Sequence, residues 1–359
     1  MNEPSFSYGT LLADVVFGEG TVDRLPAELD RLGFRRVLLL TGPSGRLHVE
    51  RLKALLGERL AGTFEEARMH VPVEIAARGV ARAIALSADA VVAFGGGSPI
   101  GLGKAIALET GLPQVVVDTT YAGSSRTPIW GMTEGGRKKT GNDPRVLPRL
   151  VIYDPRLTYS LSPRTTAASG MNAIAHCVEA LYSAQRNPVT DLLAERGIFE
   201  LGWAIPRAVR EATDVEARRR ALLGAFLAGT ALGSVGMALH HKLCHALGGG
   251  FDLPHAETHA VILPHVVRFN EPFAGGAIAA TARALGVADA AAGLFDLLTV
   301  TGLPRSLAEL GLAEDSLDRA ADLATQNPYF NPRPVDRPAV RVLLEDAFRG
   351  RLAARGASG

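Results

Sequence analysis

The sequence predicts an α/β protein of two domains, and three observations carry that prediction. Short apolar runs alternate with helical patterns up to about residue 160, and alanine and leucine at helical spacing dominate the rest. The chain has 359 residues, which is more than one hydrophobic core usually serves. We therefore expect a Rossmann-like domain with an open parallel sheet at 1–160 and an all-helical domain at 161–359.

Four apolar runs are predicted as strands of the parallel sheet: 36–41, 88–94, 114–118 and 149–153. Continuous runs rich in β-branched residues are typical of strands that are buried on both faces. Segments 21–33 and 73–87 have apolar residues three and four apart, which predicts helices between the strands. In such a sheet, ligands bind beyond the carboxyl ends of the strands.

Residues 121–150 have a different pattern, with several glycines, Pro128 and the basic run Arg137-Lys138-Lys139. This segment is predicted to be a loop or a β-hairpin that crosses the active site. We expect that site to lie in the cleft between the two domains.

The composition favours a small-molecule partner. With 38 basic and 37 acidic residues the formal net charge is +1, which gives no electrostatic reason to expect nucleic acid or an anionic membrane as a partner. The two cysteines, Cys177 and Cys244, are too few for a disulfide framework, and we expect both to be buried. The N-terminus lacks the pattern of a signal peptide, so the expected location is the cytoplasm.

A glycine-rich turn, Gly95-Gly96-Gly97, follows one predicted strand and precedes a helical segment at 100–108. Glycines let the backbone approach a pyrophosphate, and a helix N-terminus offers free N–H groups to it. The spacing matches neither G-x-G-x-x-G nor the Walker A pattern, and a tight turn without ligand is the alternative. Hydroxyl groups after the strand 114–118 are expected at the same nucleotide. The predicted cofactor-binding residues are Gly42, Pro43, Gly96, Gly97, Ser98, Thr119, Thr120, Ser124 and Lys139.

The turn after the first predicted strand, Gly42 to Arg46, contains no carboxylate. NAD-selective domains often place an acidic residue at this point to bind the ribose hydroxyl groups. Because Arg46 is nearby instead, we expect NADPH to be used alongside NADH.

Six of the nine histidines lie between His240 and His265. On a helix, His241 and His245 share a face, as do Asn172 and His176. The glycines at 248–250 are predicted to end the first of these helices, and the following loop brings back His255. We interpret His176, His241, His245 and His255 as functional, and His240, His259 and His265 as core or surface residues.

Four motifs together resemble the iron-containing (group III) alcohol dehydrogenases, over almost the whole chain. They are GGGSPI-x3-K at 95–104, DTTYAGS at 118–124, the pair Asn172 and His176, and H-x3-H-x9-H at 241–255. In that family an aspartate and three histidines hold Fe²⁺ or Zn²⁺. The resemblance places these ligands at Asn172, His176, His241 and His255, and a further histidine near the substrate at His245.

Two positions depart from the alcohol dehydrogenases, Asn172 and Gly101, where that family has aspartate. An amide oxygen cannot neutralise a metal ion as a carboxylate does. Both departures, and segments 69–76, 127–155 and 331–348, resemble the maleylacetate reductase branch. Ser125-Arg126 departs from that branch too.

The resemblance implies that NADH or NADPH reduces the conjugated C=C bond of maleylacetate to 3-oxoadipate in aromatic-compound degradation. It also implies a homodimer. Hydride addition β to the ketone leaves an enolate, which imidazole donors can stabilise without a metal, and a histidine can then supply the proton. The choice between His241 and His245 stays open.

The two substrate carboxylates require cationic partners. The candidates for substrate binding are Arg126, Lys138, Lys139, Lys242 and Tyr121, and solvated surface charges are the alternative. Lys104 is interpreted either as a ligand contact or as an exposed helix residue. Two other functions remain open: a metal-dependent alcohol or polyol dehydrogenase, and an NAD(P)-binding regulatory protein without turnover.

Overall fold

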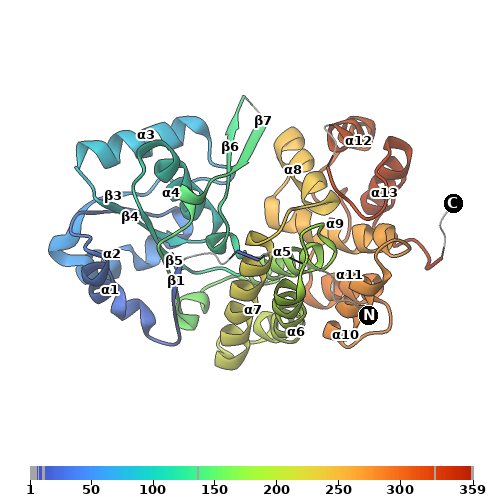
Figure 1. Ribbon diagram of the computed structural model, residues 1–359, viewed down its shortest axis with the longest axis horizontal. Helices are drawn as coiled ribbons and strands as arrows, with labels where there is room; N and C mark the ends of the chain where they lie inside the picture. Colours follow the sequence, from blue (N-terminus) through green and yellow to red (C-terminus); the bar gives the residue numbers. More distant parts are fainter. Residues whose placement is uncertain (1–5, 7, 10–12, 136, 327–328, 357–359) are drawn as a thin grey trace. The chain divides into compact units, whose positions relative to one another are not determined.

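The computed structural model describes residues 6, 8–9, 13–135, 137–326 and 329–356. It divides into two compact units, Leu11–Ser160 and Leu161–Gly359, with Met1–Thr10 grouped with the second. The first unit is an α/β sandwich, and its described elements are followed by helices only (Figure 1). The predicted fold class, a Rossmann-like α/β domain followed by an all-α domain, is confirmed.

The sheet of the first unit has six parallel strands in the order β1-β8-β5-β4-β2-β3. Their bounds are β1 Asp14–Phe17, β2 Val37–Leu40, β3 Leu60–Phe64, β4 Ala90–Gly95, β5 Gln114–Asp118 and β8 Leu150–Tyr153. The four strands predicted from apolar runs are β2, β4, β5 and β8, which form the centre of the sheet. The two edge strands, β1 and β3, were not predicted because they are only partly buried and carry no long apolar run.

Four helices cover the two faces of this sheet: α1 Leu25–Leu32, α2 Arg46–Leu56, α3 Val73–Ala85 and α4 Gly97–Thr110. Alternate residues of each strand point to opposite faces. Val37 and Leu39 of β2 therefore pack with α1 and α2, whereas Leu38 and Leu40 pack with α3 and α4. The sheet is buried on both faces, as its continuous apolar strands predict.

The segment that leaves β5 forms an antiparallel β-hairpin, which confirms one of the two structures predicted for it. Its strands are β6 Ile129–Glu134 and β7 Arg137–Asn142. Thr133 of β6 also bridges to Pro72 at the start of α3, so the hairpin is attached to the sandwich near its turn.

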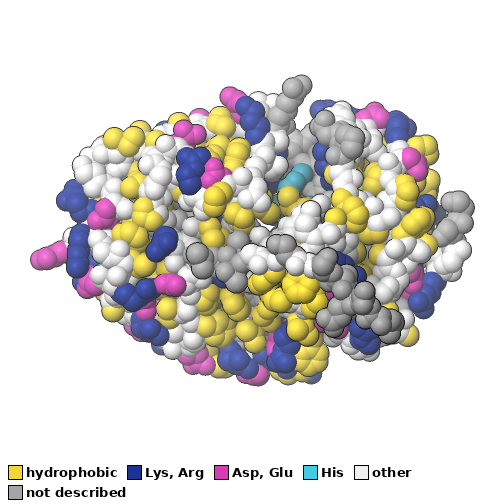
Figure 2. Space-filling view, viewed as in Figure 1, with side chains coloured by type: hydrophobic (Ala, Val, Ile, Leu, Met, Phe, Trp, Pro, Cys, Tyr) yellow, Lys and Arg dark blue, Asp and Glu magenta, His cyan; other side chains and the backbone are white. Residues whose placement is uncertain are grey.

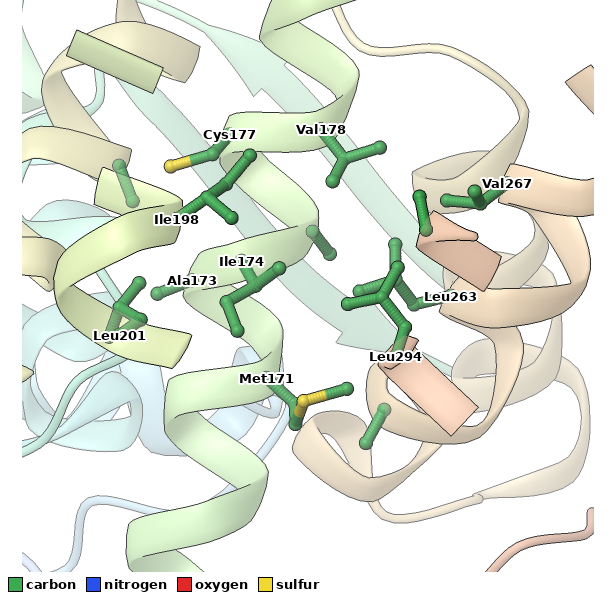
Figure 3. Packing of buried hydrophobic residues seen from close by; sticks show 14 of the residues in the cluster. Met171, Ala173, Ile174, Cys177, Val178, Ile198, Leu201, Leu263, Val267 and Leu294 are labelled. Atoms are coloured by element: carbon green, nitrogen blue, oxygen red, sulfur yellow. The ribbon is translucent and has the colours of Figure 1, made fainter. Parts of the chain in front are cut away.

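The second unit is built from nine helices among its described residues. They are α5 Pro163–Tyr182, α6 Pro188–Arg210, α7 Val215–Gly233, α8 Leu239–Phe251, α9 His255–Asn270, α10 Gly275–Leu285, α11 Ala290–Thr301, α12 Leu317–Thr325 and α13 Arg337–Arg349. Helix α5 runs through the main core, where Met171, Ile174 and Val178 meet side chains from its neighbours (Figure 3). Cys177 lies in this core and Cys244 in the neighbouring one, which confirms that both cysteines are buried.

Helix α8 does not end at its three glycines, so that prediction is wrong. The helix continues through Gly248–Gly250 to Phe251 and ends at Asp252, which adopts a left-handed conformation with φ of 54°. A Cβ at Gly250 would lie 2.9 Å from Leu323 of α12. The glycine therefore allows close helix packing, and tertiary contacts override its low helix propensity. His255 is also not in a loop, because it is the first residue of α9.

Among the described residues, no single helix combines the length and apolarity needed to cross a membrane. The bent pair α10 and α11 meets the length and composition criteria only when the two helices are taken together.

Candidate active site

The predicted nucleotide turns lie at the switch point of the sheet. Strands β2 and β4 are parallel neighbours. From β2 the chain goes by α2 to the edge strand β3, whereas from β4 it goes by α4 to β5 on the other side. The connections thus diverge where Gly42 follows β2 and Gly96 follows β4. Open α/β sheets bind ligands at such a point.

The glycine-rich turn and the residues after β5 are in contact. Gly96 is the N-cap of α4 and offers no side-chain cap to the helix. A Cβ at Gly96 would meet Thr120 Cγ2 at 2.5 Å, whereas a Cβ at Gly97 would have no atom within 4 Å. The backbone N–H of Thr119 donates to the carbonyl oxygen of Gly95 at 3.1 Å. A helix N-terminus is therefore exposed beside Gly97, next to two threonines, as a phosphate cradle requires.

The other predicted cofactor residues are more dispersed. Gly42 packs against the backbone of Ala67, since a Cβ there would lie 2.9 Å from its carbonyl oxygen. Ser124 begins a short 3-10 helix on the way to the hairpin. Lys139 is an exposed residue of β7 and pairs with Glu134 at 2.6 Å. The side chain of Arg46, on which the NADPH prediction depends, lies outside the described part of the structure.

The predicted substrate-binding residues lie in the core of the α/β unit, on the β-hairpin and on helix α8. Tyr121 is fully buried in the α/β unit, and Arg126 is 4% exposed and donates to the carbonyl oxygen of Ala13. Lys138 is half-buried on β7, where Lys139 is exposed. Lys242 belongs to α8 in the helical unit, and its Nζ lies 5.7 Å from the ring centre of Tyr329.

A buried polar group at the ends of β5 and β8 was missed by sequence reasoning. The Ser125 hydroxyl donates to Asp118 Oδ2 at 2.7 Å and lies 3.0 Å from the hydroxyl of Tyr153. Burial raises the pKa of Asp118 to about 6, although hydrogen bonds from Ser125 and Thr120 act in the opposite direction. Ser125 thus supplies a neutral hydrogen-bond donor to the buried carboxylate of Asp118.

In the helical unit, six histidines from three helices form one cluster. Helix α5 contributes His176, α8 contributes three, and α9 contributes two. Adjacent ring centres lie 4.4 to 6.1 Å apart. The four histidines predicted as functional all belong to this cluster: His176, His241, His245 and His255.

His240 and His259 are buried, as predicted for core residues, and they also belong to the cluster. The ring of His259 lies 4.4 Å from that of His255 and 4.9 Å from that of His241. His255 and His259 are four residues apart on α9, the same spacing that indicated His241 and His245. The pair was missed because His255 was assigned to a loop. His265 lies apart from the cluster, edge-on to Phe295 at 6.1 Å.

The buried imidazoles of His240 and His259 are held neutral. Burial, with the neighbouring histidines, lowers the pKa of His240 to about 4 and that of His259 well below its usual value. Nε2 of His240 donates to the carbonyl oxygen of His259 at 3.1 Å. Both ring nitrogens of His259 are buried without a hydrogen-bond partner, as is Nε2 of His241. Orphaned polar atoms are rare in folded proteins, so these nitrogens are available to a ligand.

Glu179 is the residue of this site that sequence reasoning missed most clearly. It lies on α5, one turn after His176, and its side chain is fully buried. Its carboxylate accepts from the backbone N–H groups of Ala238, His240 and His241 and lies 2.7 Å from Nδ1 of the His241 ring. Burial opposes ionisation, but His241 and the other donors hold the pKa of Glu179 below its usual value. The available signal was a carboxylate three residues after a cluster histidine.

Comparison with known proteins identifies the family. Residues 13–155 match the model of the iron-containing alcohol dehydrogenases, and residues 166–348 match the model of the C-terminal domain of that family. The maleylacetate reductase of Burkholderia cepacia is 52% identical over 346 residues, which cover 96% of this chain and 98% of the relative.

Solved structures agree with this assignment. The crystal structure of a putative alcohol dehydrogenase from Ralstonia eutropha JMP134 has 50% identity and a TM-score of 0.96, covering 98% of this chain and 100% of that one. The maleylacetate reductase of Agrobacterium tumefaciens has 48% identity and a TM-score of 0.93 with the same coverage. The chain is therefore an oxidoreductase that belongs to the iron-containing alcohol dehydrogenase family and, within it, to the maleylacetate reductases.

Proposed function

We propose that this protein reduces the conjugated C=C bond of maleylacetate to 3-oxoadipate with NADH or NADPH, in the degradation of aromatic compounds. The observation that carries the proposal is the 52% identity to a maleylacetate reductase over 96% of the chain. The chemistry also suits the site, because a reaction that creates an enolate and then consumes a proton needs hydrogen-bond donors. A cluster of six imidazoles, one of which contacts a buried carboxylate, offers such donors.

The α/β unit fits a nicotinamide dinucleotide at the switch point. Open space beside Gly97 and the uncapped start of α4 suit a pyrophosphate, and Thr119 and Thr120 offer hydroxyl groups beside it. When bound, a reduced nicotinamide supplies the hydride. The proposal requires that this cofactor and the histidines of the helical unit reach the same substrate molecule.

The residues of the helical unit fit a divalent metal poorly. Ligand atoms of His240, His241 and His259 lie within 4.8 Å of one another, and the side-chain oxygen of Asn172 is buried without a partner. None of these donors is a carboxylate. Glu179, the carboxylate that reaches the cluster, is engaged by three backbone N–H groups and by His241. Buried charge without neutralisation is costly, so we propose a reaction without a bound metal.

The roles of the chain's residues follow from the charge that develops. The enolate oxygen would accept hydrogen bonds from imidazole groups of the cluster, and the carbon α to the ketone would take a proton from His241 or His245. His176 and His255 would complete the donor set. Lys242 would bind one substrate carboxylate from α8, while Arg126, Lys138, Lys139 and Tyr121 remain the candidates for the other. A cytoplasmic homodimer is part of the same proposal.

The deciding experiment is NADH oxidation with maleylacetate as substrate, with and without exhaustive chelation. We expect equal rates in both and 3-oxoadipate as the product, with NADPH also used. A rate abolished by chelator and restored by Zn²⁺ or Fe²⁺, together with alcohol oxidation, would replace the proposal with a metal-dependent alcohol dehydrogenase. Binding of NADH without turnover of maleylacetate would reject enzymatic reduction of this substrate.

A further inference from the structure

We propose that Glu179 is a positioning residue for the reduction: it orients the ring of His241 and selects the tautomer with which His241 faces the substrate. The predicted effect of Glu179 on catalysis rests on the proposed function. The predicted tautomer of His241 rests on geometry alone. The carboxylate lies on α5, whereas the ring that it holds lies on α8.

Helix α8 begins without a side-chain cap of its own. Its N-cap is Ala238, which has no side chain that can accept a hydrogen bond, and the structure shows no side-chain cap from within the helix. Glu179 supplies the missing acceptors from α5. Its Oε2 accepts from the N–H of Ala238 at 2.9 Å, and its Oε1 accepts from the N–H groups of His240 at 2.8 Å and His241 at 3.3 Å. A carboxylate is favoured at this end of a helix.

The same carboxylate also contacts the imidazole ring of His241. Oε2 of Glu179 lies 2.7 Å from Nδ1 of His241, and the side chains are 0% and 5% exposed. An ionised carboxylate only accepts hydrogen bonds, so Nδ1 must carry the hydrogen. Nε2 is then the atom that exchanges a proton, and it is buried without a partner.

Glu179 accepts hydrogen bonds from three backbone N–H groups and also from the ring of His241. Few other side chains can accept all of these hydrogen bonds. In Glu179→Gln, the amide oxygen is best placed at the Oε1 position, where it can accept from two backbone N–H groups. The amide nitrogen then replaces Oε2 and points at Nδ1 of His241. Since that nitrogen donates, the ring must turn to the tautomer with hydrogen on Nε2. A histidine in the wrong tautomer no longer performs proton transfer although its position is kept.

The structure therefore predicts a specific kinetic pattern with maleylacetate and NADH. Glu179→Gln should lower kcat at least about ten-fold, because general acid catalysis contributes about 10² to 10⁴-fold, and should change the KM for NADH less than about two-fold. In a His241→Ala background, adding Glu179→Gln should cause no further loss, since Glu179 acts through that ring. Losses that multiply in the double variant, or a Glu179→Gln variant with the wild-type kcat, would overturn the proposal.

A matched control separates positioning from capping. Asp214 caps α7 by accepting from the N–H of Ala217 at 2.9 Å, and it contacts no residue of the cluster among those the structure describes. Asp214→Ala should lower Tm as loss of a cap does and leave kcat unchanged. If Glu179→Gln lost no more activity than this control at equal loss of Tm, Glu179 would be structural only.

A measurement that needs no substrate keeps the two proposals apart. In the ¹⁵N NMR spectrum of histidine-labelled protein, the His241 signals are those missing from His241→Ala. Wild-type protein should show hydrogen on Nδ1, and Glu179→Gln should show neutral His241 with hydrogen on Nε2. Wild-type His241 in the neutral Nε2–H form would overturn the positioning role even if Glu179→Gln failed to fold. Absence of maleylacetate reduction would instead reject the proposed function and leave the tautomer result standing.

Discussion

The ammonium group of Lys104 lies 2.8 Å from the carbonyl oxygen of Thr127, deep inside the α/β unit. The same Nζ also donates to the carbonyl oxygens of Ser124 and Ile129, at 2.8 and 2.7 Å. Lys104 is only 2% exposed, so its interpretation as an exposed helix residue is wrong. Lys104 lies on helix α4 and binds the segment that leads into the hairpin. Helix α4 itself begins at the glycine-rich turn.

Replacing Lys104 by methionine should therefore destabilise the protein by about 2 to 3 kcal/mol, because several buried carbonyl oxygens lose their donor. The methionine keeps the volume of the side chain, so the loss reports the hydrogen bonds. Urea denaturation measures it. The control is Lys53→Met, which removes a partly exposed lysine that pairs with Glu50 and should change stability by less than about 0.5 kcal/mol. Equal stability of the two variants would contradict the anchoring role.

Asp118 should make stability depend on pH in the direction opposite to an ordinary paired carboxylate. Its pKa is about 6 in the folded protein, against an ordinary value of 3.8. Between these pH values the folded chain keeps a proton that the unfolded chain has lost. Stability that is present at about pH 4 is therefore lost as the pH rises to about 6, by up to roughly 3 kcal/mol.

The variant Asp118→Asn should remove that loss. Its amide can accept from the N–H of Thr120 and donate to the Ser125 hydroxyl, which then donates to Tyr153. We expect the variant to be more stable than wild type at about pH 7 and similar at about pH 4, as measured by urea denaturation. Asp143 provides a control of opposite sign, because Arg145 holds its pKa below the ordinary value. A constant difference between Asp118→Asn and wild type across this range would contradict the assignment.

The centre of the fold was predictable because its signals are local. The buried strands β2, β4 and β5 each contain a continuous apolar run and are followed by glycine or threonine, so the sequence of each strand indicates its own burial. The edge strand β3 has a small and partly polar sequence that pairs with β2 only once the sheet exists. Helix α8 was assigned too short because helix propensity is local, whereas the packing of Gly250 against Leu323 is not.

In the candidate site, too, residues with a local sequence signal were predicted and residues defined by long-range contacts were not. Spacing along one helix revealed His241 with His245 and Asn172 with His176. Glu179 forms its decisive contact with a residue 62 positions later, and no spacing rule connects the two. Likewise, Ser125 was recognised as a departure from the family, but its hydrogen bond to the buried carboxylate of Asp118, seven residues earlier, was not predicted.

Two adjacent glycines test the phosphate cradle. A Cβ at Gly97 would meet no protein atom within 4 Å, so Gly97→Ala should leave Tm nearly unchanged. If a pyrophosphate lies against this turn, the added methyl group should raise the KM for NADH at least about ten-fold, with a smaller effect on kcat. The comparison is Gly96→Ala, whose Cβ would lie 2.5 Å from Thr120 and should lower Tm. An unchanged KM in Gly97→Ala would place the cofactor elsewhere.

The variant Asn172→Asp introduces the carboxylate that the alcohol dehydrogenases have at this position. Asn172 is 3% exposed and its side-chain oxygen has no partner. Asn172→Asp should be less stable than wild type in chelator by about 1 to 3 kcal/mol, because a buried carboxylate lacks compensation there. Zn²⁺ should restore the stability by binding the folded state, and metal retained after dialysis should rise at least about ten-fold.

The matched control for that variant is Asn187→Asp. Asn187 is 4% exposed and caps α6 by accepting from the N–H groups of Val189 and Thr190, and aspartate is an equally good N-cap. This variant makes the same chemical change away from the histidines, so its Tm should not respond to Zn²⁺. If both variants retained equal amounts of metal, Asn172 would not face the ligand atoms of the cluster. If Asn172→Asp alone gained metal, the amide at this position would be what weakens metal binding by the wild-type cluster.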